Sequence, residues 1–347
     1  MRTNIYIILT LLVVSGCSKT KYVTMSAMMP AEITFPVEVR RMALVNRTII
    51  ENKNANIIEG VLTGEMPGED RAGVQEMMNA FQSTISNTPR FEVIRATEEL
   101  EGNSFGRAFP TPLEWEKVEE LCNKYNCDVL VSVEMFDTDF VTDRSIRKVK
   151  QIVEIAGGKR EVFANEFYVT GVGNVTAGFR IYDPVTKNLV DEQLFTETHR
   201  WQTSGGNPAV SLSGIISRMD AIRYVSGLAG SGYAHKIAPL PIRIRREFYS
   251  KSRRTPQIAT GTRLGDVNEW EEAIEVWKMG LDTRKLKDAG KLCYNIAIGY
   301  EVLGELDLAI EWAKKSYVNY GNKLAQNYTY RLERRKNEEM IIDEQLK

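Results

Sequence analysis

Apolar residues recur with two different periods along the chain, and each period predicts a different element. Runs in which apolar residues alternate or follow one another are typical of strands, and they occur over residues 38–45, 91–94, 128–136, 149–155, 162–182, 189–201 and, as a short strand or extended link, 242–248. Apolar residues three and four apart are typical of amphipathic helices, and they predict helices over residues 70–85, from Thr111 with Pro112 as the first helical residue, and over 208–237. The polar run from Asp183 to Asn188 predicts the turn of an antiparallel hairpin.

After Pro256 the composition shifts to helix-forming residues. Strands and helices are therefore mixed up to about residue 250, and helices alone follow. This order predicts an α+β or α/β fold, with a mixed sheet and flanking helices over residues 32–250 and an all-α domain of helical hairpins over residues 257–342. A chain of 347 residues is long enough to bury two cores.

The helical region contains an internal repeat. Residues 268–277 and 304–313 are alike, and Ala273 and Ala309 are 36 residues apart, close to the 34 of a tetratricopeptide (TPR) repeat. The second segment resembles that family most closely, because the residues at its large, small, aromatic and turn positions match: Ile296, Ala297, Tyr300, Gly304, Ala309, Ala313 and Ser316. The resemblance covers about one and a half to two repeats, with residues 323–342 as a polar capping helix.

The TPR resemblance implies a concave groove formed by the first helix of each pair. By that pattern the groove is lined by Lys291, Tyr294, Ile298 and Glu301, which are expected to bind a protein partner. The alternative is that these side chains cover the preceding domain.

The beginning of the chain has the form of a bacterial lipoprotein signal. Arg2 is followed by a nearly continuous apolar run from Ile5 to Val14, which has the length of a signal-peptide core and about half the roughly twenty residues of a membrane span. The sequence Val14-Ser15-Gly16-Cys17 has the form of a lipobox. We therefore expect a signal peptide over residues 1–16, lipid on Cys17, and a tether over residues 17–31. The alternative is an ordinary signal peptide or a buried helix with a chance cysteine.

The residues that follow Cys17 bear on localisation. Ser18 comes next, so the aspartate that marks inner-membrane retention is missing, and no acidic cluster of the kind that marks surface export follows. By these rules of the lipoprotein class, we expect a protein anchored in the outer membrane and facing the periplasm, with surface exposure left open.

The first domain resembles the α/β fold of CsgG-type curli secretion-pore subunits, TolB amino-terminal domains and outer-membrane penicillin-binding-protein activators. The resemblance rests on hydrophobic strands and a hairpin turn at residues 41–47, 89–95, 126–133 and 179–190. Such motifs imply a fold more than an activity. The whole arrangement, including the junction at residues 233–249, also resembles a family of uncharacterised Bacteroidota lipoproteins.

The sequence contains no recognisable catalytic or metal-binding set. Its only histidines are His199 and His235, which is too few for a multi-histidine cluster. We therefore expect no catalytic residues, no metal and no cofactor. The formal net charge of −1 argues against a nucleic-acid-binding protein.

Two further groups of residues have open interpretations. The carboxylates Glu134, Asp137 and Asp139 follow a predicted strand and are expected to be solvated, the alternative being an acid/base pair or a calcium site. Cys122 and Cys127 are expected to pack as small apolar residues, with a disulfide as the alternative.

A basic run occupies the junction between the two predicted domains, and it comprises Arg243, Arg245, Arg246, Lys251, Arg253 and Arg254. Alternation with Ile242 and Ile244 predicts that the arginines share one face of a strand. Such a run is either a solvated or salt-bridged face or a contact for an anionic surface or partner.

These features together favour a non-enzymatic scaffold of the cell envelope, attached to the membrane through Cys17 and binding an envelope protein through its TPR-like tail. The alternatives are a secretion-pore subunit similar to the curli channel, with residues 149–201 contributing membrane strands, and a hydrolase or sugar-binding envelope protein. The oligomeric state stays open.

Overall fold

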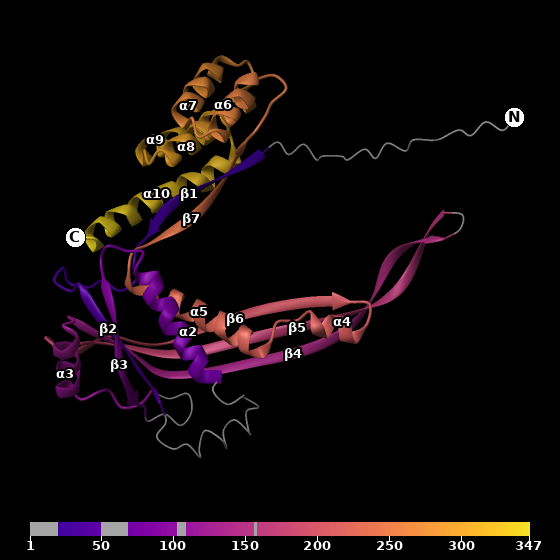
Figure 1. Ribbon diagram of the computed structural model, residues 1–347. Coiled ribbons are helices and arrows are strands. Elements are labelled where there is room, and N and C mark those ends of the chain that lie inside the picture. Colours follow the sequence, from indigo (N-terminus) through magenta and orange to yellow (C-terminus); the bar gives the residue numbers. More distant parts are fainter. Residues whose placement is uncertain (1–19, 50–68, 103–108, 156–157) are drawn as a thin grey trace. The chain divides into compact units, whose positions relative to one another are not determined.

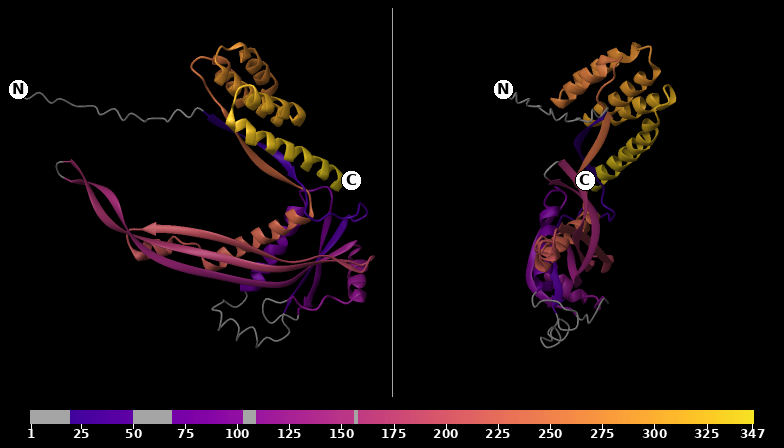
Figure 2. Two further views of the ribbon diagram at one scale, coloured as in Figure 1. Left: turned by 180° about the vertical axis from the view of Figure 1, so that it is seen from behind. Right: turned by 90° about the vertical axis from the view of Figure 1, so that its right-hand side faces the viewer.

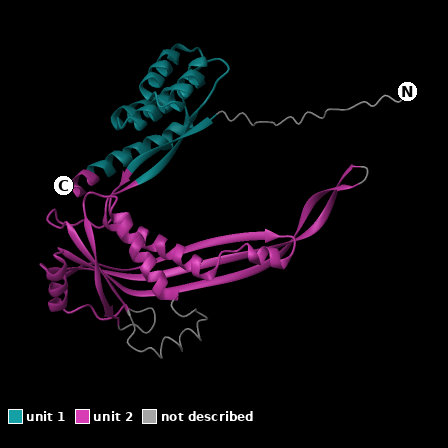
Figure 3. Cartoon of the chain, in the orientation of Figure 1, with its two compact units in different colours: residues 1–27, 242–340 teal, residues 28–241, 341–347 magenta. Residues whose placement is uncertain are grey.

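A computed structural model describes residues 20–49, 69–102, 109–155 and 158–347 (Figure 1). The predicted signal peptide and Cys17 lie outside these described residues. The chain divides into two compact units, which are residues 28–241 with 341–347, and residues 1–27 with 242–340 (Figure 3). The former is called the sheet unit below, and the latter the helical unit.

The sheet unit is built on one mixed sheet. Its five strands lie in the order β3-β2-β4-β5-β6 and comprise β2 (Arg41–Ile49), β3 (Glu92–Glu101), β4 (Val129–Ile155), β5 (Gly158–Asp183) and β6 (Asn188–Gly205). β2 pairs in parallel with β3 and β4, whereas β4 with β5 and β5 with β6 form antiparallel hairpins. The predicted α+β fold with a mixed sheet and a C-terminal helical region is therefore confirmed.

Helices cover both faces of this sheet. α2 (Glu69–Ile85) and α5 (Arg218–Ile237) lie on one face, where Met77 and Phe81 pack with Leu44 of β2. α3 (Trp115–Tyr125) lies on the other, where Val118 packs with Ala43. Successive residues of β2 thus enter different cores, because side chains alternate across a strand. The predicted helix over residues 208–237 is two helices, since Asn207 caps α4 (Pro208–Ser213) and Ser217 caps α5.

β4 is one strand of 27 residues, although the sequence predicted two separate strands over 128–136 and 149–155. Its ladder with β5 runs from Leu130 opposite Tyr182 to Ile155 opposite Gly158. The polar segment in the middle stays extended because cross-strand hydrogen bonds satisfy its backbone, and because its side chains beyond Phe140 are largely exposed on both faces of the hairpin.

The helical unit contains most of a two-stranded sheet and a run of helices. β1 (Thr20–Met29) pairs with β7 (Leu240–Tyr249), and the helices that follow are α6 (Pro256–Asp266), α7 (Trp270–Met279), the 3-10 turn η1 (Gly280–Asp282), α8 (Leu286–Val302), α9 (Leu306–Val318) and α10 (Lys323–Gln345). The tether expected over residues 17–31 is wrong for most of its length, because β1 lies within it.

α8 and α9 form a helical hairpin. Gly304 makes the turn with φ +82°, a left-handed conformation that glycine adopts at little cost. Small residues at the interface, among them Ala297, Ala309 and Ala313, are fully buried and let the helices approach closely. None of the helices in the described part of the chain is both long enough and apolar enough to span a membrane.

Candidate functional site

The four predicted groove residues lie on α8, but they do not line an open groove. Tyr294, Ile298 and Glu301 are buried at 7%, 0% and 1% exposure, and Lys291 is half-buried. Lys291 forms an ion pair of 2.6 Å with Asp288. The predicted partner-binding surface is therefore wrong, because this face of α8 is covered by elements of its own unit.

Glu301 shows what covers that face. Its carboxylate accepts two hydrogen bonds from Arg246 of β7, at 2.8 and 2.9 Å. It also accepts one from Tyr328 at 2.7 Å and one from Arg335 at 2.9 Å, both on α10. Burial opposes the ionisation of Glu301, but the hydrogen bonds from Arg246, Tyr328 and Arg335 outweigh it, so the pKa of Glu301 lies below its usual value. The same site raises the pKa of Tyr328, first through burial and then through the Glu301 charge.

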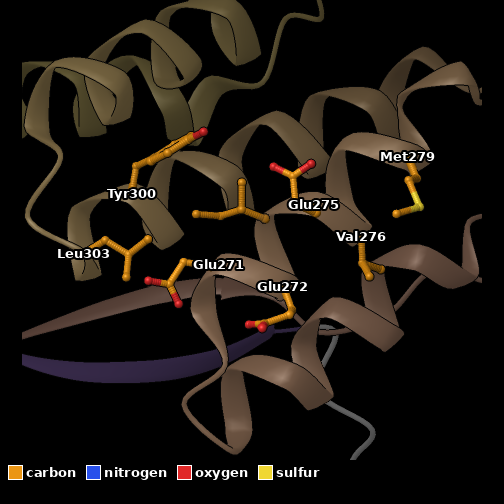
Figure 4. Close-up of a pocket in the computed structure, with 8 residues that line it drawn as sticks. Glu271, Glu272, Glu275, Val276, Met279, Tyr300 and Leu303 are labelled. Carbon is orange, nitrogen blue, oxygen red and sulfur yellow. The ribbon is translucent and has the colours of Figure 1, made fainter.

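An open groove lies instead between the outer face of α7 and the end of α8. It has a volume of about 430 Å³ and is lined by Glu271, Glu272, Ile274, Glu275, Val276, Met279, Tyr300 and Leu303. Figure 4 shows Tyr300 and Leu303 at one end of the groove and Met279 at the other. The walls therefore combine apolar side chains with three carboxylates.

Helix periodicity explains the composition of this groove. Trp270, Ala273 and Trp277 occupy the inner face of α7 and are buried. Val276 lies at the edge of that face and is half-buried, whereas Met279 lies opposite it and is 70% exposed. These residues were not among the predicted site residues, although the sequence carries a signal for them: α7 has apolar residues outside its buried face, more than one buried stripe requires.

The structure places the residues of the predicted basic run in different environments. Arg243, Arg245, Lys251, Arg253 and Arg254 are exposed, whereas Arg246 turns inward to Glu301 with 14% of its side chain exposed. Arg243 and Arg245 do share one face of β7, but Arg246 lies on the other, since neighbouring residues of a strand point to opposite sides. The prediction that the arginines share a face is correct for these two and wrong for Arg246.

The acidic cluster expected to be solvated is also divided, because β4 continues through it. Glu134 is fully buried, Asp137 half-buried and Asp139 exposed. Glu134 forms an ion pair of 2.7 Å with Arg47 of β2 and accepts a hydrogen bond of 2.7 Å from Tyr182 of β5. The expectation of a solvated acid is therefore wrong for Glu134, which sits inside a network joining three strands.

That network also holds the segment before α3. Arg47 donates to the carbonyl of Thr111 at 2.8 Å, Arg180 donates to that of Pro110 at 2.6 Å, and the Tyr182 hydroxyl accepts from the Leu113 amide at 3.1 Å. These bonds hold residues 110–113, which lie outside the helix. α3 begins at Trp115, so the predicted start at Pro112 is wrong. Burial is the main cause that raises the pKa of Tyr182, to about 12, and the Glu134 charge adds to it.

Cys122, Cys127 and Cys293 are buried free thiols. The first two line a second cavity, of about 560 Å³, on the sheet unit, together with Asp128 and Asp183. Asp128 accepts the amides of Arg40 and Arg41, and Asp183 accepts those in its own turn, so both carboxylates stabilise backbone. A hydrogen bond between the two thiols raises the pKa of Cys122 and lowers that of Cys127.

Both histidines pack against neighbours. The ring of His199 lies 4.6 Å from that of Trp201 and 4.9 Å from that of Tyr224, and His235 contacts the Ser231 carbonyl at 2.8 Å. Within the described ranges, no three histidine, cysteine or acidic side chains gather as metal ligands would.

Comparison with known families finds two matches. Residues 39–249, more than half of the chain, match the family described as a domain of unknown function (DUF8603). Residues 259–334 match a second domain of unknown function (DUF6340). A search of curated protein sequences found no match.

Among solved structures, TolB from Acinetobacter baumannii is similar at 10% identity and a TM-score of 0.17, over 49% of this chain. The chain covers 25% of the length of that TolB structure. The PelC dodecamer from Paraburkholderia phytofirmans is similar at 10% identity and a TM-score of 0.22, over 62% of this chain and 99% of that one.

Proposed function

The chain belongs to the DUF8603 family, and we propose that this member is a lipid-anchored, non-enzymatic scaffold of the cell envelope that binds a protein partner through its C-terminal helices. The observation that carries this proposal is the groove on α7 and α8. It exposes Val276, Met279 and Leu303 beside three glutamates, which suits an amphipathic segment with basic residues. The docking site is thus the outer face of α7, in place of the covered face of α8.

We further propose that the C-terminal helices are TPR-like repeats. Support comes from the α8–α9 hairpin with its Gly304 turn, and from the buried small residues Ala297, Ala309 and Ala313. The sheet unit then serves as a structural or docking module, and its sequence motifs resemble those of CsgG-type and TolB amino-terminal domains. The likeness to Bacteroidota lipoproteins is part of the same proposal.

The anchor rests on the lipobox at Val14–Cys17. In the proposal, lipid on Cys17 holds the protein in the outer membrane facing the periplasm. Feeding cells an alkyne-tagged palmitate tests this, and we expect the wild type to incorporate the label and a Cys17→Ala variant to lose it. Label that persists in Cys17→Ala would contradict lipidation at that residue.

Site-specific photocrosslinking in intact cells tests the docking groove. A photoreactive amino acid is placed at Met279 or at Leu303, with Val318 of α9 as a control that is 75% exposed on the same unit. We expect one discrete crosslinked protein from both groove positions and none from Val318. Reversing charge with Glu271→Lys and Glu272→Lys should weaken that crosslink. Equal crosslinking at all three positions, or none in the groove, would overturn the docking site.

A further inference from the structure

We propose that the outer face of the β1–β7 sheet is a membrane-contacting surface that binds the phosphates of anionic lipid headgroups. The inference deepens the proposed function and rests on the lipid anchor at Cys17. Its surface, called the basic face below, comprises Tyr22, Arg243 and Arg245 on the strands, and Lys251, Arg253 and Arg254 just after β7.

Strand alternation creates the basic face. Ile242, Ile244 and Phe248 point inward with Arg246, whereas Arg243 and Arg245 are exposed on the opposite side. The guanidinium of Arg245 lies 3.8 Å from the ring centroid of Tyr22 on β1, and Tyr22 is 55% exposed. Tyrosine and arginine side by side suit the interfacial layer of a bilayer, where an aromatic ring meets the headgroups and a cation meets phosphate.

The charges on the basic face are not neutralised by the protein. Among the described residues, no carboxylate forms an ion pair with any of its five cations, whereas neighbouring Lys21 is paired with Asp266 at 2.5 Å. One acidic residue, the half-buried Glu247, shares the outward register of Arg243 and Arg245. The face therefore keeps an excess of positive charge that attracts an anionic surface.

The chain path brings this face to the membrane. β1 and β7 run side by side in opposite directions (Figures 1 and 2), so the beginning of β1 lies beside the end of β7 that leads to Lys251. Thr20 is the third residue after Cys17. Even fully extended, three residues span only about 10 Å. A lipid on Cys17 therefore holds the basic face within reach of the headgroups.

This short reach favours a lipid surface over an acidic protein as the occupant. A free tether over residues 17–31 would span roughly 50 Å and let the body rotate away from the bilayer. Because β1 occupies that segment, the anchor and the basic face approach the same surface together. Lipidation combined with basic residues is a two-signal mode of membrane attachment.

Hydrogen–deuterium exchange on the full lipidated chain tests the proposal. The chain is reconstituted into vesicles of phosphatidylcholine alone or with about 30% phosphatidylglycerol, which makes the surface strongly anionic. We expect exchange in β1, β7 and the segment 250–254 to slow several-fold in the anionic vesicles. Arg243→Glu combined with Arg245→Glu should abolish that difference. The control, Lys148→Glu with Lys150→Glu, makes the same charge change at two exposed residues of the β4–β5 hairpin and should preserve it.

Flotation of the vesicles distinguishes the proposed lipid anchor at Cys17 from lipid binding by the basic face. If the wild type carries no lipid and does not float with phosphatidylcholine vesicles, the proposed anchor fails and this inference falls with it. If the lipidated chain floats but its β1–β7 exchange is the same in both vesicle types, the basic face is not a lipid-binding surface and the anchor stands. Loss of the headgroup effect in the hairpin control as well would also overturn the assignment to the basic face.

Discussion

Arg246 of β7 and Glu301 of α8 form a bidentate ion pair, with nitrogen–oxygen distances of 2.8 and 2.9 Å. The Glu301 side chain is fully buried and that of Arg246 is 14% exposed. The pair connects β7 to α8, and Tyr328 and Arg335 of α10 bind the same carboxylate.

Removing Arg246 should destabilise the helical unit strongly. Arg246→Met leaves Glu301 with fewer partners in a buried site, and breaking a buried pair costs about 3–5 kcal/mol. Urea unfolding measures the loss. The matched control is Arg245→Met at the next, exposed position, where we expect a change within about 0.5 kcal/mol. Equal effects of the two substitutions would show that the pair does not stabilise the fold.

Acid should weaken the helical unit through Glu301. The pKa of Glu301 is lower in the folded state than in the unfolded chain, where it is about 4.3. Its stabilising contribution is therefore complete above the unfolded pKa and is lost as pH falls through the folded pKa. The stability difference between wild type and Glu301→Gln should shrink as pH falls from about 5 to 3. Urea midpoints at a series of pH values measure it, and parallel curves would contradict the prediction.

Glu134 should be indispensable to the sheet unit. Glu134→Gln leaves Arg47 and Arg180 buried without the carboxylate, at an expected cost of about 3 kcal/mol. Tyr182→Phe removes one hydrogen bond to Glu134 and should cost about 1 kcal/mol. The control is Asp139→Asn, an exposed carboxylate on the same strand, which should leave thermal unfolding unchanged. A Glu134→Gln variant as stable as Asp139→Asn would refute a structural role for the network.

Two glycines of α5 should respond oppositely to alanine. A Cβ at Gly230 would lie 2.0 Å from the Met77 carbonyl oxygen of α2, so Gly230→Ala must push the helices apart and should cost about 1–3 kcal/mol. A Cβ at Gly227 would meet its nearest atom at 3.9 Å, so Gly227→Ala should be neutral or stabilise by about 0.5–1 kcal/mol. Thermal unfolding of the two variants compares them directly. A stabilising Gly230→Ala would show that α2 and α5 do not make this close approach.

Part of this fold follows from local patterns. Val74, Met77, Phe81 and Ile85 recur at helical spacing, and all four are buried in α2 within the range that the sequence predicted. The turn at residues 183–188 also follows from its own residues, since the Asp183 carboxylate accepts the amides of Val185 and Thr186. Such interactions lie within one element, so the sequence nearby is enough to predict them.

Part of the groove could be predicted from the sequence. Helical spacing places Ala273 and Trp277 on one face of α7, Val276 at the edge of that face and Met279 on the opposite face. The sequence therefore shows apolar residues beyond the buried face. The sequence of α8 does not predict in the same way which of its faces is covered. Tyr328 and Arg335 of α10 donate hydrogen bonds to Glu301. The periodicity of α8 cannot predict these contacts, because they come from another helix.

By itself, the sequence determined the mixed α+β class, the helical C-terminal region, the hairpin turn and the lipobox that predicts an anchor. Only the tertiary structure decided that residues 20–29 are a strand, that Glu134 is buried, and that Arg246 turns away from Arg245. β1 finds its hydrogen-bonding partner in β7, more than two hundred residues later in the chain. Glu134 is buried because Arg47 and Arg180 arrive from other strands. A buried charge is stable only when other groups pair with it, and a strand only when another strand pairs with it. Here those partners are distant in sequence, so tertiary packing decides whether these residues are buried or form a strand.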